Sequence, residues 1–254
     1  MLAKSAKRIF MVAVLMAIAA GCTSKASVLT SVNPEPTATP SPSPAIEHVQ
    51  ELEFQGMPYL LSVPADYDAK ADKKWPLIMF LHGYGMNEEY LRNLGIITAV
   101  DQLAQPFITI TPITTKGFWQ SDEDKLVGML DEVAQHYRVD KSKMYLTGES
   151  MGGFETWDLP AAHPGIFAAI APIENGGDVT LAPKLVDVPI WAFHNKLDTI
   201  ISWETTEKMV NAVKDAGGKE VLFTIHDQTG HDGYTKTFHD PQFFEWLLKH
   251  SLKK

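Results

Sequence analysis

The sequence contains one cysteine among its 254 residues. A single cysteine forms no disulfide within the chain and builds no Cys-X-X-Cys zinc or redox site, so both are excluded. Cationic residues are also few: 22 Lys and Arg stand against 31 Asp and Glu, which gives a net charge of −9. Such an acidic chain repels nucleic-acid phosphates, and nucleic-acid binding is excluded. The apolar fraction of 45% excludes a disordered or collagen-like chain.

The first 22 residues have the pattern of a secretory signal peptide. Basic residues at positions 4, 7 and 8 precede the apolar run Ile9–Ala20, which is too short for a transmembrane helix. The ending, Ala-Ala-Gly-Cys at 19–22, resembles a bacterial lipobox, in which the cysteine becomes the lipidated first residue of the mature chain. We therefore expect a membrane anchor at Cys22 and an extracytoplasmic location in the cell envelope. The alternative is ordinary signal cleavage with a spare cysteine.

Residues 23–45 are rich in Pro, Ser and Thr, with five prolines between positions 34 and 44. This segment has no apolar periodicity to bury, so we expect an extended linker. The remaining residues, 46–254, are enough for one domain with a sizeable core. The predicted organisation is a signal peptide (1–22), a linker (23–45) and one folded domain (46–254).

From residue 46 onward, apolar runs typical of strands alternate with stretches typical of helices. The strand-like runs are Tyr59–Val63, Leu77–Leu81, Phe107–Thr111, Met144–Thr147, Ala168–Pro172, Ile190–His194 and Val221–His226. The helix-like stretches are Glu88–Asn93, Asp122–Tyr137, Met151–Ala162, Trp203–Ala216 and Pro241–His250. Alternation of this kind indicates right-handed βαβ units. We therefore expect one α/β domain with a doubly wound, mostly parallel sheet.

Residues 148–153, Gly-Glu-Ser-Met-Gly-Gly, match the Gly-X-Ser-X-Gly pattern of a nucleophile elbow. They lie between a predicted strand and a predicted helix, which is the context that an elbow requires. The glycines are needed because the serine occupies a tight, strained turn that tolerates no neighbouring side chains. The pattern predicts Ser150 as a catalytic nucleophile, and the alternative is a glycine-rich turn of a non-enzymatic domain. Glu149 adds a carboxyl group where negative charge would develop, which is tolerable if it points away or pairs with a base.

A nucleophilic serine needs a base and an acid that orients the base, and in this arrangement they follow in the order acid, then histidine. Asp198 lies on the loop directly after the predicted strand Ile190–His194, so it is the favoured acid. The competing acids are Asp178, Asp187 and Glu174. His231 lies in a glycine-flanked loop after the last predicted strand and is favoured as general base over His226, which ends that strand.

An oxyanion hole needs two backbone N–H groups, one of them from the loop after an early strand. The loop after Leu77–Leu81 offers Tyr84 N–H, which we expect to act beside Met151 N–H. We expect His82 to organise this substrate-binding loop. Trp119 lies on another loop after a strand and is a candidate for stacking on an acyl or sugar group; the alternative is an aromatic that caps the core.

Five segments together resemble one group of α/β-hydrolases. They are FLHGYG at 80–85, YLTGESMGG at 145–153, WD at 157–158, FAAIAP at 167–172, and the stretch from WAFH at 191–194 to Asp198. The group comprises serine esterases similar to polyhydroxybutyrate depolymerases and feruloyl esterases, and is related to carbohydrate esterase family 1. The resemblance covers nearly all of residues 50–250. It implies an α/β-hydrolase fold without a large inserted lid, and a cofactor-free carboxylic ester hydrolase with Ser150, Asp198 and His231 as its triad.

The resemblance leaves the substrate open, because members of the group cleave acetyl, feruloyl, other short acyl or polyester bonds. A small-molecule or polymeric ester is therefore the expected substrate. Two other functions stay open: a serine peptidase of the prolyl-oligopeptidase type, and a non-catalytic lipoprotein that binds a ligand in the same cleft. A metal site among the His and Asp residues of 226–232 is disfavoured, because the predicted triad already uses the best-placed histidine.

Overall fold

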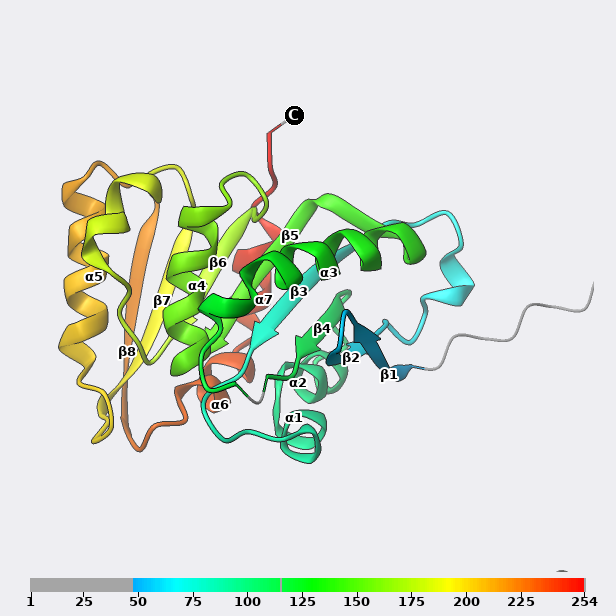
Figure 1. Ribbon diagram of the computed structural model, residues 1–254, viewed down its shortest axis with the longest axis horizontal. Coiled ribbons are helices and arrows are strands. Elements are labelled where there is room, and N and C mark those ends of the chain that lie inside the picture. Colours follow the sequence, from blue (N-terminus) through cyan, green and yellow to red (C-terminus); the bar gives the residue numbers. More distant parts are fainter. Residues whose placement is uncertain (1–47, 115, 254) are drawn as a thin grey trace, which may run out of the picture. The chain divides into compact units, whose positions relative to one another are not determined.

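The computed structural model describes residues 48–114 and 116–253. In these residues an eight-stranded sheet forms the central layer, with the strand order β1-β2-β4-β3-β5-β6-β7-β8 (Figure 1). The strands are β1 (Val49–Phe54), β2 (Met57–Ser62), β3 (Trp75–Leu81), β4 (Ile108–Pro112), β5 (Val139–Glu149), β6 (Ala169–Ile173), β7 (Ile190–Leu197) and β8 (Val221–Thr229). The β1–β2 and β2–β4 pairs are antiparallel and the others are parallel. The predicted mostly parallel sheet is confirmed.

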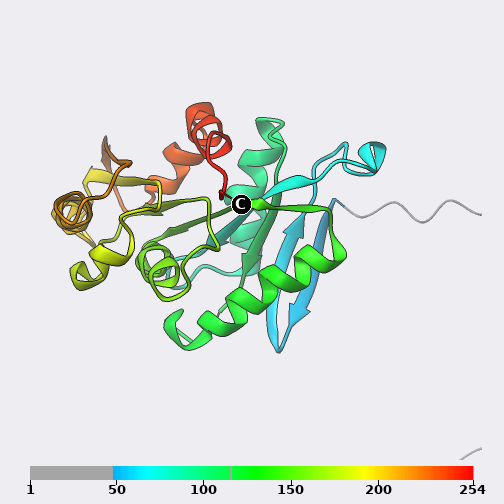
Figure 2. The same ribbon diagram turned by 90° about the horizontal axis from the view of Figure 1, so that it is seen from above.

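Helices cover both faces of this sheet. They are α1 (Glu88–Leu94), α2 (Ile96–Gln102), α3 (Glu123–His136), α4 (Met151–Ala162), α5 (Trp203–Asp215), α6 (Gly233–Phe238) and α7 (Pro241–Leu248). Helices α3, α4 and α5 share one apolar core with the sheet, and α1, α2, α6 and α7 share a second core on the opposite face (Figure 2). This arrangement is the doubly wound architecture that the alternation of runs predicts.

The apolar patterns explain why these segments adopt their structures. All seven residues of β3 are buried, as expected for a central strand that is covered on both faces and therefore reads as a continuous apolar run. In α3 the buried residues Leu126, Met129, Leu130 and Val133 recur at helical spacing and form one apolar stripe. The Asp240 carboxylate caps the start of α7 by accepting a hydrogen bond from Gln242 N–H.

The topology brings several loops to one edge of the sheet. Strands β3 to β8 run parallel to one another, so their carboxyl ends lie together, which is where open α/β sheets bind ligands. Among the described residues, the connection between β6 and β7 contains no helix longer than the 3₁₀ helix η3 (Val179–Lys184), and no lid domain is inserted there.

The predicted signal peptide, the lipidation site Cys22 and the linker lie outside the described residues. The anchor therefore stays a prediction. Of the helices that the structure does describe, none is both long enough and apolar enough to cross a membrane.

Candidate active site

Ser150 occupies a strained turn between β5 and α4. Its φ of 55° and ψ of −113° put a residue with a side chain in a backbone region that non-glycine residues rarely adopt. Two hydrogen bonds hold the turn: Ser150 N–H donates to Ile173 O at 3.0 Å, and the Asn175 side-chain amide donates to Ser150 O at 2.9 Å. The neighbouring strand β6 therefore fixes the conformation that the elbow pattern predicts.

The glycines around Ser150 are required by close backbone contacts. A Cβ atom on Gly152 would lie 1.9 Å from Leu81 O, and one on Gly148 would lie 2.3 Å from Gly152 O. A Cβ on Gly153 would meet Ile173 O at 2.2 Å. These contacts join the turn to β3 and β6, so a larger residue at any of the three positions would push the turn out of place.

His231 and Asp198 meet at the same edge of the sheet. His231 Nδ1–H donates to Asp198 Oδ2 at 2.6 Å, and Asp198 Oδ1 accepts the N–H groups of Ile200 at 2.7 Å and Ile201 at 3.1 Å. Burial alone would raise the pKa of Asp198, but these hydrogen bonds outweigh it and lower the pKa. Asp198 is thus held as a carboxylate that faces the imidazole.

Of the four competing candidates, all except Glu174 lie away from His231 and Asp198. His226 bonds to Thr237 and stacks on Phe193, Asp178 caps η3, and the Asp187 carboxylate pairs with Lys219. Within the part of the chain that the structure describes, none of these three side chains hydrogen-bonds or pairs with His231 or Asp198.

His194 is a further contact of Asp198 that the sequence patterns did not single out. Its Nε2–H donates to Ile201 O at 3.0 Å and lies 3.2 Å from Asp198 Oδ2, while Nδ1 accepts from Thr206 Oγ at 2.8 Å. Burial is the main cause that lowers the pKa of His194, so the ring is neutral at neutral pH. His194 therefore helps to fix Asp198 without adding charge.

The other ring nitrogen of His231, Nε2, has no hydrogen-bond partner among the described residues, including Ser150 Oγ. The structure thus brings Ser150 and His231 to one sheet edge but does not join them by a hydrogen bond. In enzymes without bound substrate such a bond is often long and tightens only in the complex.

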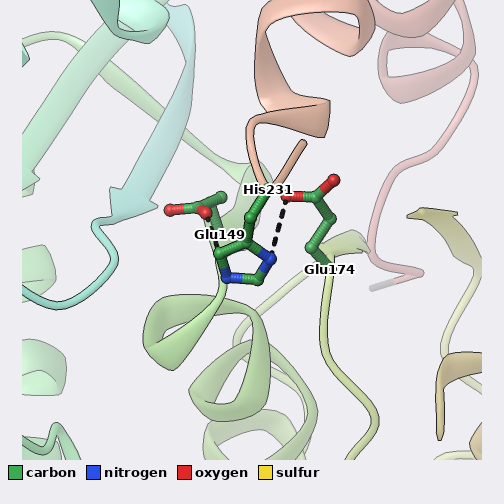
Figure 3. A group of neighbouring side chains, drawn as sticks. All are labelled: Glu149, Glu174 and His231. Atoms are coloured by element: carbon green, nitrogen blue, oxygen red, sulfur yellow. Dashed lines mark ion pairs between the residues drawn. The ribbon is translucent and has the colours of Figure 1, made fainter. Parts of the chain in front are cut away.

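Two more carboxyl groups flank the imidazole (Figure 3). Glu149 Oε1 lies 3.7 Å from His231 Nε2, and Glu174 Oε2 lies 3.5 Å from His231 Nδ1. Burial, followed by the nearby carboxylates of Glu174 and Asp198, raises the pKa of Glu149 well above its usual range. Burial likewise raises the pKa of Glu174 to about 8. Burial thus favours the protonated form of both glutamates, whereas its hydrogen bonds favour the ionised form of Asp198.

Glu149, Glu174 and His231 also offer one ligand atom each within 4.8 Å of one another, which raises the question of a metal ion. The two carboxyl groups face opposite nitrogens of one imidazole, whereas an ion would use only one nitrogen. Nδ1 already donates a hydrogen bond to Asp198. The donor geometry suits hydrogen bonding and proton transfer better than metal coordination.

The predicted oxyanion-hole residues line a common cavity with the serine. Tyr84, Ser150 and Met151 face a cavity of about 440 Å³ that Phe118, Gly117, Gln120, Phe154, Asn175 and Ile201 also line. Met151 is the first residue of α4, so its N–H is one of those that have no acceptor within the helix. Both predicted amide donors therefore belong to residues at the mouth of the same cavity.

His82 lies in the loop that carries Tyr84, and its ring and backbone make hydrogen bonds there. Burial lowers the pKa of His82, and the neutral ring donates Nδ1–H to Gly83 O at 2.7 Å and accepts Thr114 N–H on Nε2 at 3.1 Å. Trp119 Nε1–H donates to His82 O at 3.1 Å. The bonds to Thr114 and Trp119 tie the loop after β3 to the segment after β4, and the bond to Gly83 lies within the loop itself.

Trp119 does not line the cavity, and the prediction that it stacks on a substrate is wrong. Its side chain is fully buried, since its indole packs edge-on against the ring of His82 inside the core. The adjacent Phe118 is 70% exposed and lines the cavity instead. The aromatic side chain at the cavity is therefore the one that precedes Trp119 in the same loop.

The chain resembles several known esterases. Residues 119–252 match the family described as "Putative esterase". A bifunctional acetylxylan esterase/xylanase of Neocallimastix patriciarum is 27% identical over 148 residues, which cover 55% of this chain and 22% of that protein. Poly(3-hydroxyalkanoate) depolymerase C of Paucimonas lemoignei is 40% identical over 48 residues, which cover 19% of this chain and 12% of that protein. The chain therefore spans less than a quarter of either relative.

Solved structures give the same result for the fold. The crystal structure of a thermostable esterase matches with a TM-score of 0.69 and 27% identity, over 80% of this chain and 63% of that one. A ferulic acid esterase matches with a TM-score of 0.65 and 16% identity, over 79% of this chain and 96% of that one. The second likeness, at its low identity, concerns the fold alone. Because the matched family spans more than half of the chain, the protein belongs to the "Putative esterase" family, and its fold is that of the α/β-hydrolases.

Proposed function

We propose that this protein hydrolyses carboxylic esters through an acyl-enzyme formed on Ser150. The observation that carries the proposal is the 2.6 Å hydrogen bond between His231 and Asp198 at the sheet edge where Ser150 occupies its strained turn. A histidine oriented by a buried carboxylate can act as general base for a serine. Membership of the esterase family supports the same reaction.

In the proposed reaction, Ser150 Oγ attacks the ester carbonyl carbon while His231 Nε2 takes the hydroxyl proton. Asp198 stabilises the imidazolium that results. The N–H groups of Tyr84 and Met151 donate hydrogen bonds to the oxyanion. His231 then gives its proton to the leaving alcohol, and the carbon–oxygen bond of the ester breaks.

The second half of the cycle uses water as the nucleophile. His231 Nε2 takes a proton from this water, which attacks the acyl-enzyme carbonyl, and the carboxylic acid leaves as the Ser150 hydroxyl is restored. Nε2 suits both steps because no protein group within the described residues occupies it.

We propose a short acyl, acetyl or feruloyl-type ester as the substrate, either free or attached to a carbohydrate or polyester. The cavity beside Ser150 supports this class, because its volume of about 440 Å³ admits an acyl group of that size. Its apolar walls come from Phe118, Phe154 and Ile201. Relatives and structural neighbours are named as acetylxylan esterase, depolymerase and ferulic acid esterase, which supports the same range.

We also propose that the enzyme is anchored to a membrane of the cell envelope through lipid on Cys22. The lipobox-like ending of the signal sequence supports this proposal. Expression of the full chain in a bacterial host with a radiolabelled fatty acid tests it, with Cys22→Ser as the control. Label in the wild-type chain and none in the variant is the expected result, and equal labelling of both would refute lipidation at this residue.

The esterase proposal is tested with p-nitrophenyl acetate, p-nitrophenyl butyrate and methyl ferulate. We expect wild-type turnover and a loss of at least about 10⁴-fold in kcat for Ser150→Ala, because the nucleophile is removed. Ser251→Ala, at an exposed serine near the C-terminus, is the matched control and should keep full activity. Labelling by a fluorophosphonate should follow the same pattern.

Three outcomes would contradict the proposal. Equal activity of wild type and Ser150→Ala would place the chemistry elsewhere. Fluorophosphonate labelling together with turnover of a peptide amide but of no ester would favour a serine peptidase. Absence of both labelling and turnover would favour a binding protein.

A further inference from the structure

The conformation and the burial of Glu174 are both energetically unfavourable, and its packing does not explain why it is there. It follows the end of β6 with a φ of 54°, a conformation that is strained for any residue other than glycine. Its side chain is fully buried, and neither carboxyl oxygen makes a hydrogen bond of good geometry with a described group. Backbone strain and the burial of an acid without a well-formed hydrogen bond both lower stability. A group retained under both penalties needs another reason.

The carboxyl group of Glu174 is aimed at His231. Glu174 Oε2 lies 3.5 Å from His231 Nδ1, the same nitrogen that donates to Asp198 (Figure 3). The other oxygen lies over Gly233, where a Cβ atom would come within 2.8 Å of Glu174 Oε1. Gly233 thus leaves room for the carboxyl group beside the imidazole. Two carboxyl groups therefore lie near His231 Nδ1: that of Glu174, from the end of β6, and that of Asp198, from the end of β7.

The groups that face Glu174 keep it neutral. Its pKa is raised to about 8, mainly by burial; the carboxylates of Asp198 and Asp232 contribute to the rise, and the backbone N–H groups of Gly233 and Asn195 act in the opposite direction. Glu149 faces the other nitrogen of the ring. At neutral pH Glu174 therefore offers a carbonyl-type acceptor to Nδ1–H without placing a second negative charge next to Asp198.

We propose that Glu174 is a positioning residue, a second acceptor for His231 Nδ1–H that holds the ring in its working orientation together with Asp198. This inference rests on the proposed role of His231 as general base. Asp198 forms the short bond and dominates in the intact protein. Glu174 keeps Nδ1 protonated and Nε2 free when the bond to Asp198 is broken.

A double-mutant cycle in the full chain tests this role. Asp198→Ala removes the main acceptor, and Glu174→Met removes the second while keeping a side chain of similar length. We expect Glu174→Met to lower kcat/KM by less than about threefold in the wild-type background. In the Asp198→Ala background the same change should cost about 10- to 100-fold, as expected for a hydrogen bond to a charged ring.

Rescue by a conservative variant separates positioning from packing. Glu174→Gln keeps a neutral acceptor oxygen, so Asp198→Ala/Glu174→Gln should stay within about threefold of Asp198→Ala. A packing role predicts instead that Glu174→Met has the same effect in both backgrounds, and that result would overturn the proposal. Because Asp198 also accepts the N–H groups of Ile200 and Ile201, circular dichroism checks folding, and Asp198→Asn replaces Asp198→Ala if the alanine variant is unfolded.

Proton NMR gives a readout that does not depend on activity. The hydrogen-bonded imidazole N–H of His231 should give a low-field resonance that persists in Asp198→Ala and disappears in Asp198→Ala/Glu174→Met. Loss of that resonance already in folded Asp198→Ala would refute the role of Glu174 even in an active esterase. If the wild type hydrolyses no ester, the proposed function fails, whereas the resonance still reports whether Glu174 contacts His231.

Discussion

The buried glutamate Glu155 should make the folded protein less stable as pH rises. It lies on α4 with a side chain that is fully buried, and both of its carboxyl oxygens lack a hydrogen-bond partner among the described residues. Its charged neighbours are the acids Glu123 and Asp158. Burial, reinforced by these acids, raises the pKa of Glu155 from 4.5 to about 8. The folded state thus favours the protonated form over a wide range of pH.

The direction and size of the effect follow from proton linkage. Below the unfolded pKa of 4.5 both states are protonated, and Glu155 contributes no pH dependence. Between pH 4.5 and about 8 the folded state keeps a proton that the unfolded chain releases, so the free energy of unfolding falls with rising pH. A difference of about 3.5 pKa units corresponds to an upper limit of about 5 kcal/mol. Relaxation around the charge reduces this, and we expect about 2–3 kcal/mol.

The substitution Glu155→Gln removes this titration and nearly preserves the shape of the side chain. Urea unfolding of both proteins at about pH 5 and about pH 9 gives the free energy of unfolding under each condition. From about pH 5 to about pH 9, we expect the free energy of unfolding of Glu155→Gln to rise by about 2–3 kcal/mol relative to that of the wild type. Glu149 and Glu174 titrate in both proteins, so the difference isolates Glu155.

Glu245→Gln is the matched control, because Glu245 is exposed on α7. In this variant the free energy of unfolding should change between the two pH values by the same amount as in the wild type, within about 0.5 kcal/mol. If Glu155→Gln and wild type lose stability in parallel from about pH 5 to about pH 9, then Glu155 is ionised in the folded protein or relaxes to water, and the reasoning from burial is wrong.

Two other predictions follow from the elbow and from the cavity. Gly152→Ala should lower the free energy of unfolding by at least about 3 kcal/mol, because the added Cβ would lie 1.9 Å from Leu81 O. Thermal unfolding measures this loss, and an unchanged midpoint temperature would contradict the close contact. Phe118→Ala should raise KM for methyl ferulate by about tenfold and leave KM for p-nitrophenyl acetate nearly unchanged, since Phe118 lines the cavity and only the larger acyl group reaches it. Equal effects on the two substrates in steady-state kinetics would refute this contact.

The parallel core of the fold could be predicted because its strands are continuous apolar runs. Each of the seven predicted runs overlaps a strand from β2 to β8. The edge strand β1 was missed because it is only partly buried, so its sequence VQELEF has no run of apolar residues. Helices α2 and α6 were also missed. Only Gly95 separates α2 from α1, so the sequence shows no loop between them, and the six residues of α6 are too few to show helical periodicity.

Only those features of the site that depend on chain order and on the position of a loop could be predicted from the sequence. Ser150, Asp198 and His231 each lie on a loop at the carboxyl end of a strand, and a sequence displays that position. Whether a loop aromatic points inward depends on tertiary packing, so Trp119 was assigned to the cavity although it is buried. The contact between Glu174 and His231 joins the ends of β6 and β8, which lie 57 positions apart in the chain, and no local pattern reveals it.

Three acidic side chains surround His231, so the site is stable only if not all of them are ionised at once. Asp198, Glu174 and Glu149 come from three strand ends, and three carboxylates beside one imidazole would repel one another and the oxyanion. Burial favours the protonated forms of Glu174 and Glu149, which lowers the negative charge that stands beside the imidazole together with Asp198. Burial of the two glutamates is therefore part of the same arrangement as the ionised Asp198. A substitution that admits water to either glutamate should weaken the proposed catalysis even if Ser150, Asp198 and His231 all stay in place.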